Sequence, residues 1–150
     1  MAYVHYLTVQ DILWIHLQVT GSVSPFDYAK LEDGAYFQYN YGRHADELSQ
    51  AGRFLPGLAR KQAFPHGNEA VAFVACLAFL KLNGIELDLK DANGTQFMHE
   101  ALEHESALEP LRRWVKDIHE PHGETVQDTV LEILAEFPKT IAALAKAPAA

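Results

Sequence analysis

Residues 62–82 read QAFPHGNEAVAFVACLAFLKL. In this segment a Gly67-Asn68 turn precedes residues that are apolar around nearly the whole circumference when drawn as a helix. Such a helix has no polar face to present to water, so the pattern predicts a central buried helix over about 69–82. Asn68 is the expected N-cap, and the negative charge of Glu69 suits the positive end of the helix.

Composition favours one folded domain over residues 1–150, because 49% of the residues are hydrophobic and 21% are charged. The formal net charge of −8 argues against a nucleic-acid partner, which requires clustered lysine and arginine. The single cysteine, Cys76, excludes an intrachain disulfide. The apolar run over 70–82 is shorter than the ~20 residues that span a bilayer, and the N-terminus has no signal-peptide pattern. We therefore expect a cytoplasmic protein that does not bind membranes.

Helical patterns also precede the central helix. Residues 8–11 resemble a capping box that opens a helix over about 9–20. A second helix is expected over 45–60, with a kink or break at Pro56 because proline lacks an N–H and crowds the preceding turn. The aromatic-rich segment 26–44 between them is predicted to be partly irregular, and its rings either cover a cleft or, for most of them, pack on the core.

Beyond the central helix the pattern predicts short connections and then more helix. The connections are a left-handed stop, a short extended piece and a turn, expected at Asn83-Gly84, 85–89 and 91–94. The helices are expected near 95–105, over 110–118 and over 124–146, the last interrupted at Pro138. The terminal helix is expected to pack on its own core. The whole pattern predicts an all-α single domain.

The turn before the central helix resembles the signature of the Fic/Doc (Fido) family, His-Pro-Phe-x-[Asp/Glu]-Gly-Asn-Lys-Arg-Thr. Phe64, Gly67 and Asn68 match this signature. Further segments are similar, in order and spacing, to Doc-type (death-on-curing) proteins, at residues 6–16, 58–68, 77–88 and 108–116. The resemblance covers about residues 3–120 and implies a compact helical core, to which a helix over 124–146 is an addition.

Proteins of this family transfer AMP or, in Doc, a phosphate to a protein hydroxyl, and some are toxins paired with an antitoxin. The resemblance implies that four chemical positions are changed in this chain. The general-base histidine is replaced by Gln62, whose neutral amide cannot accept the proton. The acid that holds magnesium is replaced by His66, a poor ligand for a hard cation. The lysine is replaced by Glu69 and the phosphate-clamping arginine by Ala70.

We therefore expect a Fic/Doc-fold pseudoenzyme that has lost the transfer reaction, needs no cofactor and acts as a noncatalytic binding or regulatory protein. The expected partner is an antitoxin-like or other regulatory protein, and homo-oligomerisation is left open. The alternative is a divergent transferase or kinase, the toxin of a toxin–antitoxin pair, that binds ATP or another nucleotide with Mg²⁺ at the Gly67-Asn68 turn and uses His66. The candidate binding residues are Phe64, His66, Gly67, Asn68, Glu69 and Ala70.

Two further groups of polar residues are weighed as sites. Histidines and acids gather at His99, Glu100, Glu103, His104, Glu105, His119 and His122. They match no zinc pattern such as His-Glu-x-x-His, so we predict a solvated polar face and no metal site, with a weak adventitious site as the alternative. Candidate phosphate ligands that the sequence alone does not bring to the turn are Arg43, Arg53, Arg60, Arg112 and Arg113.

Overall fold

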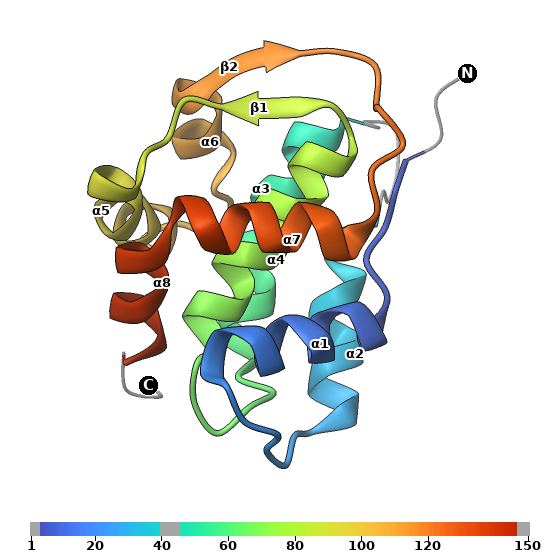
Figure 1. Ribbon diagram of the computed structural model, residues 1–150, viewed down its shortest axis with the longest axis vertical. Helices are drawn as coiled ribbons and strands as arrows, with labels where there is room; N and C mark the ends of the chain where they lie inside the picture. Colours follow the sequence, from blue (N-terminus) through green and yellow to red (C-terminus); the bar gives the residue numbers. More distant parts are fainter. Residues whose placement is uncertain (1–3, 40–45, 147–150) are drawn as a thin grey trace.

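The computed structural model describes residues 4–39 and 46–146. Within these residues it contains eight helices and one two-stranded sheet, so the predicted all-α class is confirmed (Figure 1). The helices are α1 (Val9–Thr20), α2 (Tyr28–Tyr36), α3 (Glu47–Lys61), α4 (Asn68–Leu82), α5 (Asp91–Ala101), α6 (Leu108–Trp114), α7 (Val126–Glu136) and α8 (Pro138–Ala145), and the strands are β1 (Ile85–Leu87) and β2 (Val115–Ile118). No helix in the described part of the chain is long and apolar enough to cross a membrane.

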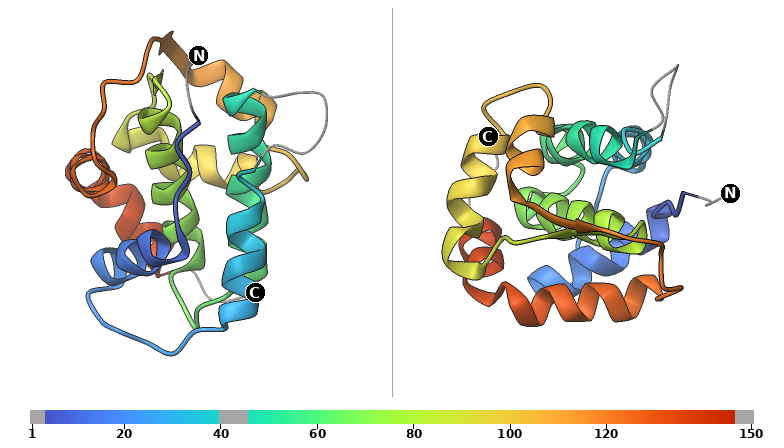
Figure 2. Two further views of the ribbon diagram at one scale, coloured as in Figure 1. Left: turned by 90° about the vertical axis from the view of Figure 1, so that its right-hand side faces the viewer. Right: turned by 90° about the horizontal axis from the view of Figure 1, so that it is seen from above.

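Helix α4 forms the centre of the molecule, as its apolar pattern predicts. Every residue of α4 except Glu69 and Lys81 is buried. Seen from above, α4 lies between α3 on one side and α1 and α7 on the other, and α8 and β1 also contact it (Figure 2). The ring of Phe73 packs edge to face on Phe137, which links the middle of α4 to the start of α8. The hydrophobic core is therefore built around one helix.

The local signals for α1 and for the end of α4 are confirmed. The Thr8 hydroxyl accepts a hydrogen bond from the N–H of Asp11 at 3.0 Å, and the Asp11 carboxylate accepts one from the N–H of Thr8 at 2.8 Å, which completes the capping box. After α4, Gly84 has a left-handed φ of 81°, and β1 follows directly. Both ends are determined by residues within one turn of them.

The C-terminal segment divides into α7 and α8 at Pro138, as predicted, and both helices pack on α4. The Asp91 carboxylate of α5 accepts hydrogen bonds from the backbone N–H groups of Lys139 and Thr140, at 3.1 and 2.8 Å, and so caps α8 from another helix. The buried apolar residues of this segment include Val130, Ile133, Ile141 and Leu144. The segment therefore covers one side of α4 and is not peripheral to the core.

Two expectations for the first half of the chain are wrong. The aromatic-rich segment is partly irregular, as predicted, but it also contains α2, because the Asp27 carboxylate accepts the N–H of Lys30 and caps a regular helix. Its rings are largely exposed and do not mainly pack on the core, as shown by Phe26, Tyr28, Tyr36 and Phe37. Tyr41 and Arg43 lie outside the described residues. Of the kink or break expected at Pro56, the break is absent, since α3 runs through this buried proline while packed between α2 and α4.

Two expectations for the second half are also wrong. The predicted turn at 91–94 is the first turn of α5, which therefore begins and ends about four residues earlier than expected. The predicted helix over 110–118 ends at Trp114, and the residues after it form β2. The register pairs Glu86 with Asp117 in an antiparallel ladder. Pairing with β1 supplies backbone hydrogen bonds to residues 115–118. The local spacing of apolar residues does not reveal this pairing.

Candidate functional site

The turn between α3 and α4 brings the predicted site residues together at the N-terminal end of α4 (Figure 1). Gln62 ends α3 with a φ of 50°, and it is the one non-glycine residue with a positive φ in the described ranges. Gly67 precedes α4 with a φ of 81°. These two left-handed residues reverse the chain, and the left-handed conformation of a glutamine marks a backbone that its surroundings hold in place.

Asn68 closes this turn with both ends of its side chain. Its Oδ1 accepts a hydrogen bond from the N–H of Phe64 at 3.1 Å, and its Nδ2 donates one to the Phe64 carbonyl at 2.8 Å. Asn68 is the first residue of α4 and not its N-cap as predicted, because Gly67 occupies the cap position and no side chain caps the helix there. The amide is 9% exposed, so its hydrogen-bonding capacity serves the turn and not a ligand.

The ring of Phe64 fills the space beside the turn. It stacks on His16 of α1, with 4.0 Å between ring centroids and an interplanar angle of 15°, and lies 6.2 Å from the ring of Phe26. The N–H of Asp27 donates to the carbonyl of Ala63 at 2.8 Å, which ties the start of α2 to the same turn. The turn is therefore packed against α1 and α2.

His16 and His66 are the two imidazoles of this region, with ring centroids 6.1 Å apart. His16 is buried, and its Nε2 has no hydrogen-bond partner among the described residues. Burial lowers the pKa of His16; a backbone hydrogen bond with His66 opposes this change, and the charge of His66 adds to it. The neutral form of His16 is favoured. No motif marks His16 in the sequence, because it reaches the turn only through the packing of α1.

The turn offers little that would hold a polyphosphate. Four of the predicted binding residues are buried, namely Phe64, Gly67, Asn68 and Ala70. His66 is exposed, while Gln62 and Glu69 are partly exposed. The groups that reach solvent are thus an imidazole, an amide and a carboxylate. Residues 62–70 contain no lysine or arginine to neutralise phosphate charge.

A cavity, which we call the α3 groove, lies along α3. It has a volume of about 550 Å³ and is lined by Phe37, Arg53, Gly57, Arg60, Lys61, Glu105 and Ser106. These residues come from the end of α2, one side of α3 and the connection between α5 and α6. A neighbouring cavity of about 270 Å³ shares Phe37 and Lys61 with it. Three lining residues are cationic although the chain has a net charge of −8.

Backbone carbonyls orient the two arginines of the α3 groove. Arg53 donates from Nη2 to the carbonyl of Tyr39 at 3.3 Å. Arg60 donates from Nη2 to the carbonyls of Leu102 and His104 at 2.7 and 2.6 Å. A carbonyl is neutral, so these bonds position each guanidinium without cancelling its charge. Arg53 and Arg60, seven residues apart, share one face of α3, but the structure does not place them at the turn.

Glycine and an ion pair shape the other parts of the α3 groove. A Cβ at Gly57 would collide with the ring of Phe37, so glycine allows this ring to lie against the backbone of α3. The Phe37 side chain nevertheless remains 37% exposed. Lys61 lies 3.5 Å from a carboxylate oxygen of Asp33, and both side chains are well exposed. An apolar ring and oriented cations therefore share one concave surface.

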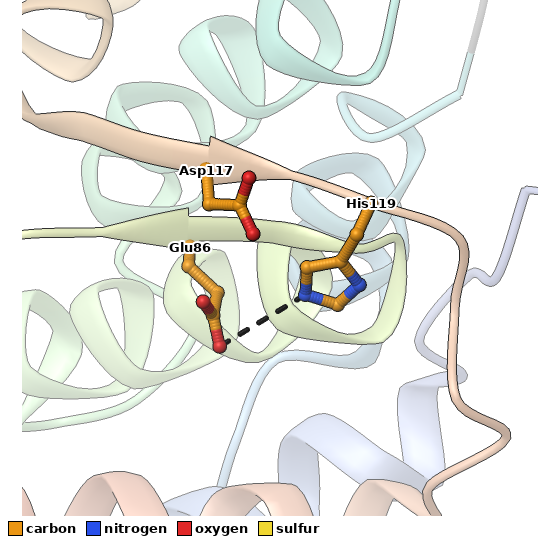
Figure 3. A group of neighbouring side chains, drawn as sticks. All are labelled: Glu86, Asp117 and His119. Atoms are coloured by element: carbon orange, nitrogen blue, oxygen red, sulfur yellow. Dashed lines mark ion pairs between the residues drawn. The ribbon is translucent and has the colours of Figure 1, made fainter.

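The predicted histidine and acid group does not form one face. His99 belongs to α5, whereas His119 and His122 follow β2 and stack on each other. His119 instead meets Glu86 and Asp117, and their candidate ligand atoms all lie within 4.8 Å of one another (Figure 3). The sequence pattern does not predict this group, because Glu86 lies on β1, which α5 and α6 separate from β2 in the chain.

Neither a comparison with protein-family models nor comparisons with curated proteins and solved structures found a match. The resemblance to the Fic/Doc family therefore stays a prediction from the sequence. Function has to be inferred from the geometry of the turn and of the α3 groove.

Proposed function

We propose that this protein is a noncatalytic binding protein that takes an acidic segment of a partner protein in the α3 groove. The observation that carries the proposal is the convergence of Arg53, Arg60 and Lys61 beside the exposed ring of Phe37. The volume of about 550 Å³ falls in the range typical of ligand sites.

The chemistry of the α3 groove favours carboxylates with an apolar neighbour. A guanidinium presents paired N–H donors that match a carboxylate, and Arg53 and Arg60 are already oriented by carbonyls. The ring of Phe37 offers an apolar contact for an aromatic or aliphatic side chain of the partner. The rest of this acidic chain repels an acidic segment, which restricts its binding to the cationic groove. Glu105, at the rim, selects against a ligand that is anionic along its whole length.

The turn at α4 supports the noncatalytic part of the proposal. Gln62 is not a base, Asn68 is engaged with Phe64, and Ala70 is buried. General acid–base catalysis contributes about 10²–10⁴-fold, and the turn has lost the phosphate-binding groups as well. A protein with the transfer reaction intact would need these groups to face a bound donor.

The proposal can be tested with a probe peptide of alternating glutamate and phenylalanine, titrated into ¹⁵N-labelled protein. We expect shifts of backbone resonances along α3 around Arg53 and Arg60, and no shifts with a peptide in which lysine replaces each glutamate. The double variant Arg53→Glu and Arg60→Glu should lose binding. Arg112→Glu, on α6 and outside the groove, is the matched control and should bind normally. Equal binding by the double variant, or no binding by any of these proteins, would refute the proposal.

A second candidate function is the divergent transferase that uses the turn. The observation that favours it is the unpartnered buried Nε2 of His16 near His66, an arrangement that leaves a nitrogen free for chemistry. Isothermal titration with ATP, with and without Mg²⁺, separates the two functions. Micromolar, Mg²⁺-dependent binding that His66→Ala weakens would favour the transferase. No heat at millimolar ATP would exclude it, and Gln62→His alone should not restore transfer.

A further inference from the structure

Three side chains with metal-binding groups share one face of the two-stranded β1–β2 sheet (Figure 3). Glu86 on β1 is the direct antiparallel partner of Asp117 on β2, so the two carboxylates lie side by side. His119 follows Asp117 by two residues, and its N–H still donates to the carbonyl of Gly84 at 2.8 Å. Because side chains alternate along extended chain, His119 points to the same face as Asp117.

A hydrogen bond outside this group determines which nitrogen of His119 faces the carboxylates. Its Nδ1 lies 2.8 Å from the carbonyl oxygen of Glu120, and a carbonyl can only accept, so Nδ1 carries a proton. The other nitrogen, Nε2, lies 3.9 Å from Oε1 of Glu86. Histidines that bind metals commonly donate the second ring N–H to a carbonyl in this way. The ring of His122 stacks on His119 at 4.4 Å and restricts its rotation.

Among the described residues, Glu86 has an ion pair with His119, and neither Glu86 nor Asp117 has one with a lysine or arginine. Like charges directly opposite each other on paired strands destabilise a sheet. Lys81 lines the adjoining cavity, but its Nζ is held by Glu132 and Glu136 at 2.8 and 2.9 Å. That cavity has a volume of about 40 Å³, which is enough for an ion and a water molecule. A divalent cation bound between Glu86 and Asp117 would remove the repulsion between the two carboxylates.

We propose that Glu86, Asp117 and His119 bind one divalent transition-metal ion of the Zn²⁺ type, with solvent completing its coordination. One imidazole nitrogen and two carboxylate oxygens suit such an ion, whereas Ca²⁺ and Mg²⁺ prefer all-oxygen sites. Metal–ligand bonds of about 2.0–2.2 Å require the side chains to move closer together, and the exposed Glu86 and Asp117 have the freedom to do so. The bound ion would hold the end of β2, from which the chain continues to α7, against β1.

Calorimetric titration of the full chain with ZnCl₂ tests the proposal. We expect one Zn²⁺ per chain and a higher melting temperature in its presence, and neither effect with MgCl₂ or CaCl₂. His119→Ala, and the isosteric pair Glu86→Gln and Asp117→Asn, should each weaken Zn²⁺ binding by at least about tenfold. His99→Ala removes an exposed histidine of α5 and is the matched control, with binding unchanged.

A measurement on the unaltered chain keeps the test independent of how the variants fold. Substoichiometric Co²⁺ should selectively broaden ¹⁵N–¹H signals of residues near Glu86, Asp117 and His119. Broadening centred on His99 and His104, or Zn²⁺ binding that His119→Ala leaves unchanged, would overturn the assignment. So would the absence of Zn²⁺ binding to the unaltered protein. None of these outcomes depends on the α3 groove.

Discussion

At each end of α4 an asparagine side chain forms hydrogen bonds with backbone groups, yet the two residues have different structural roles. Asn68 at the N-terminal end bonds both the N–H and the carbonyl of Phe64, four residues before it. Asn83 at the C-terminal end bonds both the N–H and the carbonyl of His5, 78 residues away, and also the carbonyl of Phe79. One amide closes a local turn, and the other attaches the N-terminal segment to the core.

This difference shows how the same side chain can have a local or a global role. The end of α4 at Asn68 is enclosed by Phe64 and His16, and its polar groups are mainly turned inward. The end at Asn83 is followed by β1, which pairs with β2, and the charged groups of this two-stranded sheet face solvent. Binding of external ligands is therefore expected at the β1–β2 sheet and along α3. It is not expected at the turn before α4, although that turn most resembles a known signature.

The largest contrast between the two ends is expected for their left-handed glycines. Gly84→Ala should lower the free energy of unfolding by about 3–4 kcal/mol, because a Cβ there is strained at φ 81° and collides with the backbone carbonyl of His119. Gly67→Ala should cost about 1–2 kcal/mol, because its Cβ would meet only the methyl group of Thr20, at 2.9 Å. Urea denaturation measures the free energy of unfolding of both variants. Equal losses would show that the backbone at β1 and β2 adjusts to a Cβ as easily as the turn does.

The asparagines themselves provide the next test. Asn83→Ala should cost about 2–3 kcal/mol and Asn68→Ala about 1–2 kcal/mol, because the first removes three hydrogen bonds and the second two. Hydrogen exchange should accelerate at the amide of His5 in the first variant and at the amide of Phe64 in the second. A larger loss for Asn68→Ala would mean that the turn, and not the N-terminal attachment, is the more important restraint.

A pH effect should be specific to the enclosed end. Burial lowers the pKa of His16 below its ordinary value of 6.5, so the unfolded chain binds the proton more readily than the folded chain. The contribution of His16 to stability is complete above pH 6.5 and is lost as the pH falls below it, toward the lowered pKa of the folded state. His16→Leu should flatten this part of the stability profile, and His99→Gln, at an exposed position of α5, is the matched control that should retain it. A profile unchanged by His16→Leu would contradict this account.

The smallest effect is expected from the ion pairs near the C-terminal end of α4. Lys81→Met removes contacts to Glu132 and Glu136 and should cost about 0.5–1 kcal/mol, less at high salt, because these carboxylates are about half exposed. Lys90→Met removes a longer, more exposed pair with Asp88 and should have no measurable effect. Denaturation in low and high salt compares the two variants, and a salt-independent loss for Lys81→Met would indicate packing of its stem as the cause.

Much of the fold follows from the sequence, whereas little of either candidate site does. The capping box at Thr8 predicts α1 correctly, and the apolar residues all around residues 69–82 predict α4 correctly. The spacing of apolar residues after Pro110 predicts a helix where β2 forms, because this spacing does not reveal the pairing of residues 115–118 with β1. The face shared by Arg53 and Arg60 can be read from their spacing, but Phe37 reaches it only when α2 packs on α3.

Local patterns in the sequence are sufficient to predict the all-α class, the burial of α4 and the positions where α1, α4 and α7 end. These features depend on the apolar period and on caps that act within one or two turns. By contrast, the pairing of Glu86 with Asp117, the stacking of His16 on Phe64 and the capping of α8 by Asp91 are visible only in the folded structure. Such contacts join segments far apart in the chain, and their geometry depends on how whole helices pack, which no local pattern specifies.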